Sequence, residues 1–127
     1  MNKDVQKISY DTVGAAIDVH KELGPGLLER VYQECLAYEL RNKGYQVESE
    51  VELPVCYKQL SFNSAYRIDL LVNKEMIVEI KSVEQVLPVH KSQLLSYLKL
   101  SDLRLGLLIN FNVPQLKQGV KRIVNQL

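Results

Sequence analysis

Two apolar segments separated by a short polar turn constrain the fold of this chain more than any other feature. Residues 67–72 and 76–81 are mostly apolar, and the polar residues 73–75 stand between them. Alternate side chains of a strand share one face. If residues 73–75 form a three-residue loop, the two segments pair as an antiparallel hairpin and Asp69 lies opposite Glu79. We therefore predict two facing carboxylates with about 5 Å between their Cβ atoms.

Two facing carboxylates destabilise a sheet unless a cation joins them. A divalent metal is one candidate for that cation, and Lys81, two residues after Glu79, is another. Oxygen ligands of this kind suit Mg²⁺ or Mn²⁺ better than zinc. The alternative interpretation is a solvated sheet face on which Arg67, Asp69, Glu79 and Lys81 form a ladder of ion pairs, because surface ion pairs are common and mostly inert.

The spacing of apolar residues changes along the chain and predicts a mixed α/β (α+β) fold. Helical spacing gives way to partial alternation after Gly44, which is a good C-terminal helix cap, and Pro54 indicates an edge strand or a bulge. The predicted helices are residues 10–23, 27–43, 88–100 and a last helix from Pro114, and the predicted strands are Val47–Tyr57 and residues 61–72, 76–83 and 104–110. The order α-α-β-β-β-α-β-α gives a four-stranded mixed sheet flanked by helices, in one domain over residues 1–127.

Composition narrows the class of protein without naming its activity. With 46% apolar and 24% charged residues in a chain of 127, we expect a folded domain and no disorder. No apolar run approaches the roughly 20 residues of a membrane span, so we expect no membrane partner. Cys35 and Cys56 are interpreted as buried reduced thiols of a cytoplasmic protein. The net charge of +1 does not itself indicate nucleic-acid binding, so that prediction rests on local chemistry.

Polar side chains on the predicted helices add three further candidates. Glu29 stands in the first turn of the second helix, where the helix dipole alone explains a carboxylate. Its functional interpretation is a further metal ligand or a residue that positions the attacking water. Gln93 and Tyr97 lie one turn apart on the third helix, either as an amphipathic stripe or as site residues. His20 lies on the apolar face of the first helix, where a core histidine is favoured over a metal ligand.

Three motifs in order resemble one known group of proteins. Asp69 followed after nine residues by Glu79-Ile80-Lys81 is similar to the D…(D/E)XK signature of the PD-(D/E)XK nucleases, although Ile68 replaces the proline of that name. The segment 93–97 resembles the QxxxY motif of one exonuclease branch. The segment 26–32 matches the GxxExxY signature of a family of small bacterial and archaeal proteins, and the resemblance runs from about residue 13 to 125.

The resemblance implies a PD-(D/E)XK nuclease-like core and a Mg²⁺- or Mn²⁺-dependent nuclease that hydrolyses phosphodiester bonds, with DNA favoured over RNA as substrate. It implies that Asp69, Glu79, Glu29 and the backbone carbonyl of Ile80 hold the metal. Lys81 would orient or deprotonate the attacking water or contact the phosphate, and Gln93 and Tyr97 would fix Lys81 and the substrate backbone. Further phosphate contacts from the last predicted helix would come from Lys117, Lys121 and Arg122.

Two other classes of function stay open at this point. One is a catalytically silent nuclease fold that binds nucleic acid or a protein partner. The other is a plain interaction protein in which the carboxylates belong to ion pairs. Neither the presence of a protein partner nor homo-oligomerisation follows from the residues. A core this small has little surface for reading bases, so we expect low sequence specificity.

Overall fold

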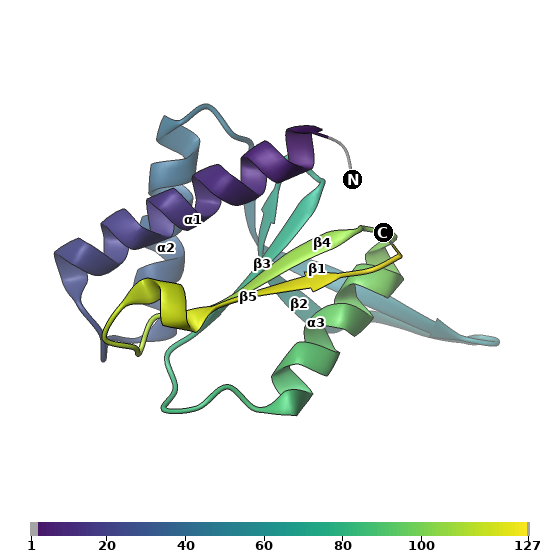
Figure 1. Ribbon diagram of the computed structural model, residues 1–127. Coiled ribbons are helices and arrows are strands. Elements are labelled where there is room, and N and C mark those ends of the chain that lie inside the picture. The colour runs from purple at the N-terminus through teal and green to yellow at the C-terminus, as the bar shows by residue number, and fades with distance from the viewer. Residues whose placement is uncertain (1–2, 127) are drawn as a thin grey trace.

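The chain folds into a five-stranded mixed sheet with helices on both faces (Figure 1). The computed structural model describes residues 3–126. Its elements in chain order are α1 (Lys3–Leu23), α2 (Glu29–Asn42), β1 (Val47–Tyr57), β2 (Leu60–Val72), β3 (Met76–Lys81), α3 (Pro88–Ser101), β4 (Leu105–Asn110), the 3₁₀ helix η1 (Leu116–Gly119) and β5 (Val120–Val124). The mixed α/β fold expected from the sequence is confirmed.

The sheet has the order β1-β2-β3-β4-β5. β3 and β4 are parallel neighbours joined by the crossover helix α3, and the other pairs are antiparallel. Both central strands are short and mostly apolar, and nearly every residue in them is buried. Central parallel strands covered by helices on both faces have this continuous apolar composition. β3 is the middle strand of the five.

Each face of the sheet has its own apolar core. Helices α1 and α2 cover one face, over side chains such as Leu70, Val78 and Leu107, and α3 covers the other, over Ile77 and Leu108 (Figure 1). A Cβ atom on residue 106 of β4 would lie 2.9 Å from a methyl carbon of Leu94, so glycine there permits the close approach of α3. Side chains of β3 that point toward α3 therefore enter the smaller of the two cores.

The predicted last helix from Pro114 is wrong. The chain forms only the short helix η1 there and then β5, which pairs antiparallel with β4 from Ile109↔Val120 to Leu105↔Val124. Val120, Ile123 and Val124 are β-branched and favour strands, and the free edge of β4 offers backbone partners that an isolated helix would leave unpaired. The sheet consequently has five strands where four were expected.

Two smaller expectations also need correction. Helix α1 begins at Lys3, not residue 10, because Val5 and Ile8 extend its buried stripe toward the N-terminus. Cys35 is half-buried and Cys56 is exposed, so the expectation of buried thiols fails, although both cysteines are free as expected. Within residues 3–126, no helix combines the length and the apolar character that crossing a membrane requires.

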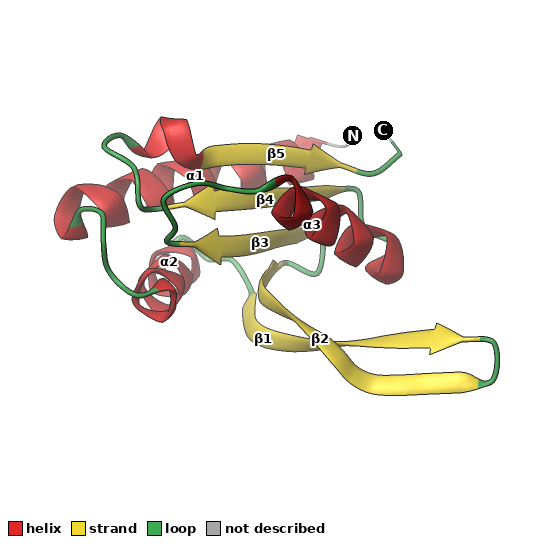
Figure 2. Cartoon of the chain, turned by 90° about the horizontal axis from the view of Figure 1, so that it is seen from below, coloured by secondary structure: helices red, strands yellow, loops and turns green. Residues whose placement is uncertain are grey.

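The outer halves of β1 and β2 leave the sheet as a two-stranded arm, residues 53–66 (Figure 2). The pairing register shifts between Leu53 and Val55, where Pro54 predicted an irregularity. A second irregularity lies nearer the sheet, where Glu50 has a positive φ of 56° inside β1. β1 and β2 therefore bend away from the sheet where Glu50 lies opposite residues 68–70 of β2, and the arm continues beyond this bend.

Candidate active site

The hairpin of β2 and β3 has the register that the sequence predicted. Val72 pairs with Met76 and Leu70 pairs with Val78, which brings Asp69 and Glu79 next in line. Asn73 and Lys74 in the turn adopt left-handed conformations, with φ of 51° and 54°. The regular Cα pairing of the two strands extends no further than Leu70 and Val78.

Beyond that point the two carboxylates replace the backbone ladder. The backbone N–H of Asp69 donates to Glu79 Oε2 at 2.7 Å, and the N–H of Ile80 donates to Asp69 Oδ2 at 2.8 Å. Ile68 joins the core under α3 whereas Leu70 joins the core under α1 and α2, so β2 turns over at Asp69. This bend separates the strands and leaves room for the two side chains between them.

Burial leaves this pair of carboxyl groups electrostatically strained. Glu79 is only 6% exposed, and burial followed by repulsion from Asp69 raises its pKa to about 8. Burial is also the main cause that raises the pKa of Asp69, whereas its hydrogen bond from Ile80 and the charge of Lys81 act in the opposite direction. A cation placed between the two groups would remove the repulsion.

No ladder of ion pairs forms at these residues. In the described part of the chain Arg67 pairs with Glu50, at 4.0 Å between Nη1 and Oε2, and the other ion pairs join Lys7 to Asp11 and Arg30 to Glu34. Lys81 lies near enough to lower the pKa values of Asp69 and Glu79 but forms no salt bridge with them. The interpretation of a solvated ion-pair ladder is therefore wrong.

The donor set fits a hard divalent cation. Asp69 and Glu79 each use one oxygen for a backbone N–H, and neither Oδ1 of Asp69 nor Oε1 of Glu79 has a hydrogen bond within residues 3–126. The N–H of Ile80 points at Asp69, and in an extended strand the C=O of the same residue points the same way. Over the same residues no group of three or more His, Cys, Asp or Glu side chains is disposed to hold a metal, so a third protein ligand would come from the backbone.

Glu29 reaches this site from the start of α2. Its Oε2 accepts the N–H of Ser82 at 3.0 Å, and the Ser82 hydroxyl donates to the carbonyl of Leu27 at 2.6 Å. These two contacts fasten the N-terminus of α2 to the residue after Lys81. Glu29 is exposed, and its charge contributes to the raised pKa values of Asp69 and Glu79.

Tyr97 approaches the carboxylates from α3, on the opposite side from α2. It is 5% exposed, and burial followed by the charges of Glu79 and Asp69 raises its pKa to about 12. Gln93, one turn earlier, is half-buried. Among the described residues no hydrogen bond joins Lys81 to Gln93 or Tyr97, so the predicted anchoring of Lys81 by these side chains is not seen.

The arrangement of a helix, a bent hairpin with facing carboxylates and a crossover helix agrees with a comparison against protein families. The family model described as the PD-(D/E)XK nuclease superfamily matches residues 6–123. The chain belongs to the PD-(D/E)XK nuclease superfamily. Searches of curated proteins and of solved structures found no match. Proteins of this superfamily are usually phosphodiesterases that use divalent metal ions.

Two residues of this PD-(D/E)XK domain that the sequence analysis did not name as site residues hold the loops around the site, although Tyr32 is the tyrosine of the GxxExxY segment. The hydroxyl of Tyr32 donates to Gly24 and accepts the N–H of Leu27 at 3.1 Å, and its ring stacks on Phe111 at 4.4 Å. Asn110 is 3% exposed and bonds both the N–H and the C=O of Val83. A buried asparagine at the end of a central strand was the available signal, because such amides are retained only with partners.

Other candidates lie away from the carboxylates. His20 is buried, and its Nε2 lies 2.9 Å from the carbonyl of Val113, which supports the core-histidine interpretation. Lys117 lies on η1 and Lys121 and Arg122 lie on β5, so the predicted basic face of a last helix does not exist. β5 is separated from β2 by β3 and β4.

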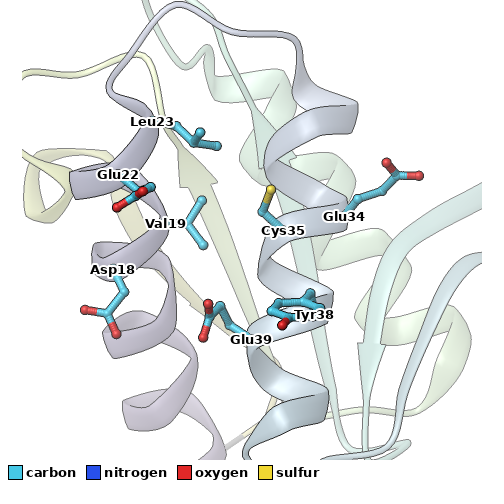
Figure 3. A pocket seen from close by; sticks show the side chains of 8 residues that line it. All are labelled: Asp18, Val19, Glu22, Leu23, Glu34, Cys35, Tyr38 and Glu39. Carbon is cyan, nitrogen blue, oxygen red and sulfur yellow. The ribbon is translucent and has the colours of Figure 1, made fainter.

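A hollow on the PD-(D/E)XK domain lies between α1 and α2, away from the carboxylate pair, with a volume of about 540 Å³ (Figure 3). Its floor includes Val19 and Cys35, and four carboxylates line it. These belong to Asp18, Glu22, Glu34 and Glu39. A polyanion is repelled by such a surface, so this hollow is not suited to nucleic acid.

Proposed function

We propose that the protein is a metal-dependent nuclease of the GxxExxY type that hydrolyses phosphodiester bonds in nucleic acid, with DNA favoured over RNA. The observation that carries the proposal is the buried pair Asp69 and Glu79, which within residues 3–126 has no salt-bridge partner and holds two carboxylate oxygens free of hydrogen bonds. A pair of this kind is costly for a sheet unless a cation joins it. The two free cysteines support a reducing compartment such as the cytoplasm.

Asp69, Glu79 and the carbonyl of Ile80 would hold Mg²⁺ or Mn²⁺, with Glu29 completing the shell through water. The bound ion would supply a water of lowered pKa and offset the charge that grows on the phosphate. Lys81 lies beside both carboxylates, where its ammonium would orient that water or contact the phosphate. Tyr97, buried on α3 and close enough for the charges of both carboxylates to affect it, would shield the site from solvent on that side.

The test is cleavage of single-stranded DNA, duplex DNA and RNA by the purified protein in Mg²⁺, in Mn²⁺ and in EDTA. Glu79→Gln and Lys81→Ala are expected to lose at least 100-fold in rate, a loss typical of groups that act on the reacting atoms. The matched controls are Glu22→Gln and Lys21→Ala, which change the same residue types at exposed positions of α1.

Cutting that requires metal, disappears in both site variants and survives in both controls would support the proposal. Cutting that the site variants retain would overturn it, because the activity would then come from elsewhere. If the wild-type protein binds DNA but does not cut any substrate, the catalytically silent alternative is favoured.

A further inference from the structure

A second groove opens beside the candidate active site, between β2 and α3. It has a volume of about 320 Å³ and is lined chiefly by Tyr66 of β2 and Tyr97 of α3. Its walls include the apolar Val89 and Leu100, and its polar edge includes Gln93 and Ser96. Pockets for small molecules span roughly 300–1,000 Å³, so this groove is of a size for one planar ring rather than a folded segment.

The two tyrosine rings contact each other, and the ring of Tyr66 is partly open to solvent. Their centroids are 5.7 Å apart and their planes are inclined by 50°. Tyr97 is buried, whereas Tyr66 remains 48% exposed. Exposed aromatic rings in proteins that bind single strands stack on successive bases, and the stacking tolerates any sequence because every base has a π-face.

One residue, Tyr97, relates the groove to the carboxylate pair. Tyr97 lines the groove and is also close enough to Asp69 and Glu79 for their charges to affect it. Tyr66 precedes Asp69 by three residues on β2, which corresponds to about 10 Å of strand. A phosphate held at the carboxylates would therefore place a neighbouring base within reach of Tyr66.

Charge and hydrogen bonding favour a base over the other ligands that an apolar groove can take. The chain carries a net charge of only +1, so phosphate attraction alone offers little affinity and another contribution is needed. Within residues 3–126 the side chains of Gln93 and Ser96 make no hydrogen bond, which leaves both for the polar edge of a base. A protein segment would need a longer apolar surface than this groove offers.

We propose that the groove of Tyr66 and Tyr97 is a nucleobase-stacking subsite, through which the nuclease prefers single-stranded nucleic acid. The proposal rests on the proposed function, since it assigns the base next to the scissile phosphate. A base in a duplex already stacks on its neighbours, so it enters the groove only when it is free of them. Double-stranded substrate would therefore not gain from this subsite.

The test uses the absence of tryptophan from the chain. Tyr66→Trp introduces a single indole in the groove, and Tyr57→Trp introduces one at the far end of the arm, where the wild-type side chain is 61% exposed. Oligo-dT and a hairpin duplex are titrated in EDTA, which prevents cutting. We expect oligo-dT to quench the indole at position 66 and not the one at position 57, and we expect the duplex to quench neither.

Affinity supplies a second measurement. Fluorescence anisotropy with labelled oligo-dT would measure the dissociation constant. We expect the affinity to fall about tenfold for Tyr66→Ala, within the range known for a lost stacking contact, and less than twofold for Tyr66→Phe and Tyr57→Ala. If Tyr66→Ala fails to fold, Ser96→Trp replaces it, because a large ring at that exposed position fills the groove and should weaken binding similarly.

Equal quenching at both positions, equal loss from Tyr57→Ala, or duplex binding that falls with Tyr66→Ala would overturn the subsite. A dimer that Tyr66→Ala disrupts, measured by light scattering, would overturn it in favour of a second copy of the chain. Failure of the nuclease proposal is distinguishable, because it appears as absent cutting in Mg²⁺ whatever the quenching shows. If the wild type shows cleavage that depends on Glu79 but oligo-dT does not quench the indole at position 66, the subsite alone is rejected.

Discussion

At the scale of single residues, the molecule places two acids where an ordinary sheet would have apolar side chains. Asp69 and Glu79 each accept a backbone N–H from the opposite strand, so the bonds that close the hairpin depend on the same groups that repel each other. The raised pKa of Glu79 reflects this repulsion, because burial and the charge of Asp69 both favour its neutral form. Two carboxylates that bind a metal ion destabilise the fold most when both are ionised and no cation is bound.

The first prediction concerns the pH dependence of stability without metal. The pKa of Glu79 is 4.5 when unfolded and about 8 when folded, so between these values the folded state binds more protons. This group's contribution to stability is therefore full below pH 4.5 and is lost as the pH rises through about 8. In EDTA, Glu79→Gln should melt roughly 4 °C above the wild type at pH 8.5, corresponding to on the order of 1 kcal/mol.

The same melting series at pH 5 should show a smaller difference between Glu79→Gln and the wild type. Glu22→Gln, at an exposed site on α1, should follow the wild type at both values. A wild type that melts higher than Glu79→Gln at pH 8.5 in EDTA would contradict the raised pKa.

The second prediction concerns metal addition. At the proposed site, Mn²⁺ and protons would compete for the same carboxylates, so binding of the ion should release protons and strengthen with pH. We expect Mn²⁺ to raise the melting temperature of the wild type more at pH 8.5 than at pH 5, and to leave that of Asp69→Asn nearly unchanged. An equal rise in Asp69→Asn would show that the ion binds elsewhere.

At the scale of elements, the site depends on loops fixed by side chains far apart in sequence. Glu29 at the start of α2 contacts Ser82, 53 residues later. Asn110 at the end of β4 forms two hydrogen bonds with Val83, one with its backbone N–H and one with its C=O. The segment that follows Lys81 is thereby held between α2 and β4. Positions within a site must be fixed closely for catalysis, and such supporting contacts provide this.

The third prediction follows from Asn110. Its replacement by alanine leaves the N–H and C=O of Val83 without partners in a half-buried loop, which should cost about 1–3 kcal/mol of unfolding free energy. Urea denaturation would measure the loss. Asn112→Ala is the matched control, since its side chain has no hydrogen bond in the described structure, and it should lose less than half as much. Equal losses would remove the special role of Asn110.

At the scale of the whole molecule, the arm (residues 53–66) and the rest of the fold, here called the body, contribute differently to stability. Tyr57, Leu60 and Phe62 near the end of the arm are all at least half exposed, so this end adds little to either core. The body, in contrast, is closed at its other edge by β5, which covers β4. Stability should therefore reside in the body, and the end of the arm should be dispensable for folding.

The fourth prediction tests this division. Replacement of residues 56–61 by Asn-Gly rejoins Val55 and Phe62, which are cross-strand partners, through a favoured two-residue turn. The shortened protein should melt within about 3 °C of the wild type, because the removed side chains are exposed. Calorimetry would measure this. A fall of 10 °C or more, which exceeds the effect of about 1 kcal/mol, would show that the arm supports the body.

Local patterns were sufficient for much of this structure. The hairpin register and the approach of Asp69 to Glu79 follow from strand alternation and a three-residue turn, and both involve only neighbours in sequence. The positions of α2, α3, β3 and β4 follow equally from apolar spacing and from proline and glycine. Motif order supplied the superfamily, which the family comparison confirmed.

Other features were decided only when distant segments came together. The spacing of apolar residues after Pro114 suits a helix as well as a strand, and the free edge of β4 decided for β5. Alternation could not reveal that β2 turns over at Asp69, that Arg67 pairs with Glu50 instead of the site, or that Tyr66 meets Tyr97. The sequence by itself determined which residue types face each other across the hairpin. The burial of the two carboxyl groups, their raised pKa values and the groove beside them came from tertiary packing. Desolvation depends on every segment that covers a group and not on its neighbours in the chain.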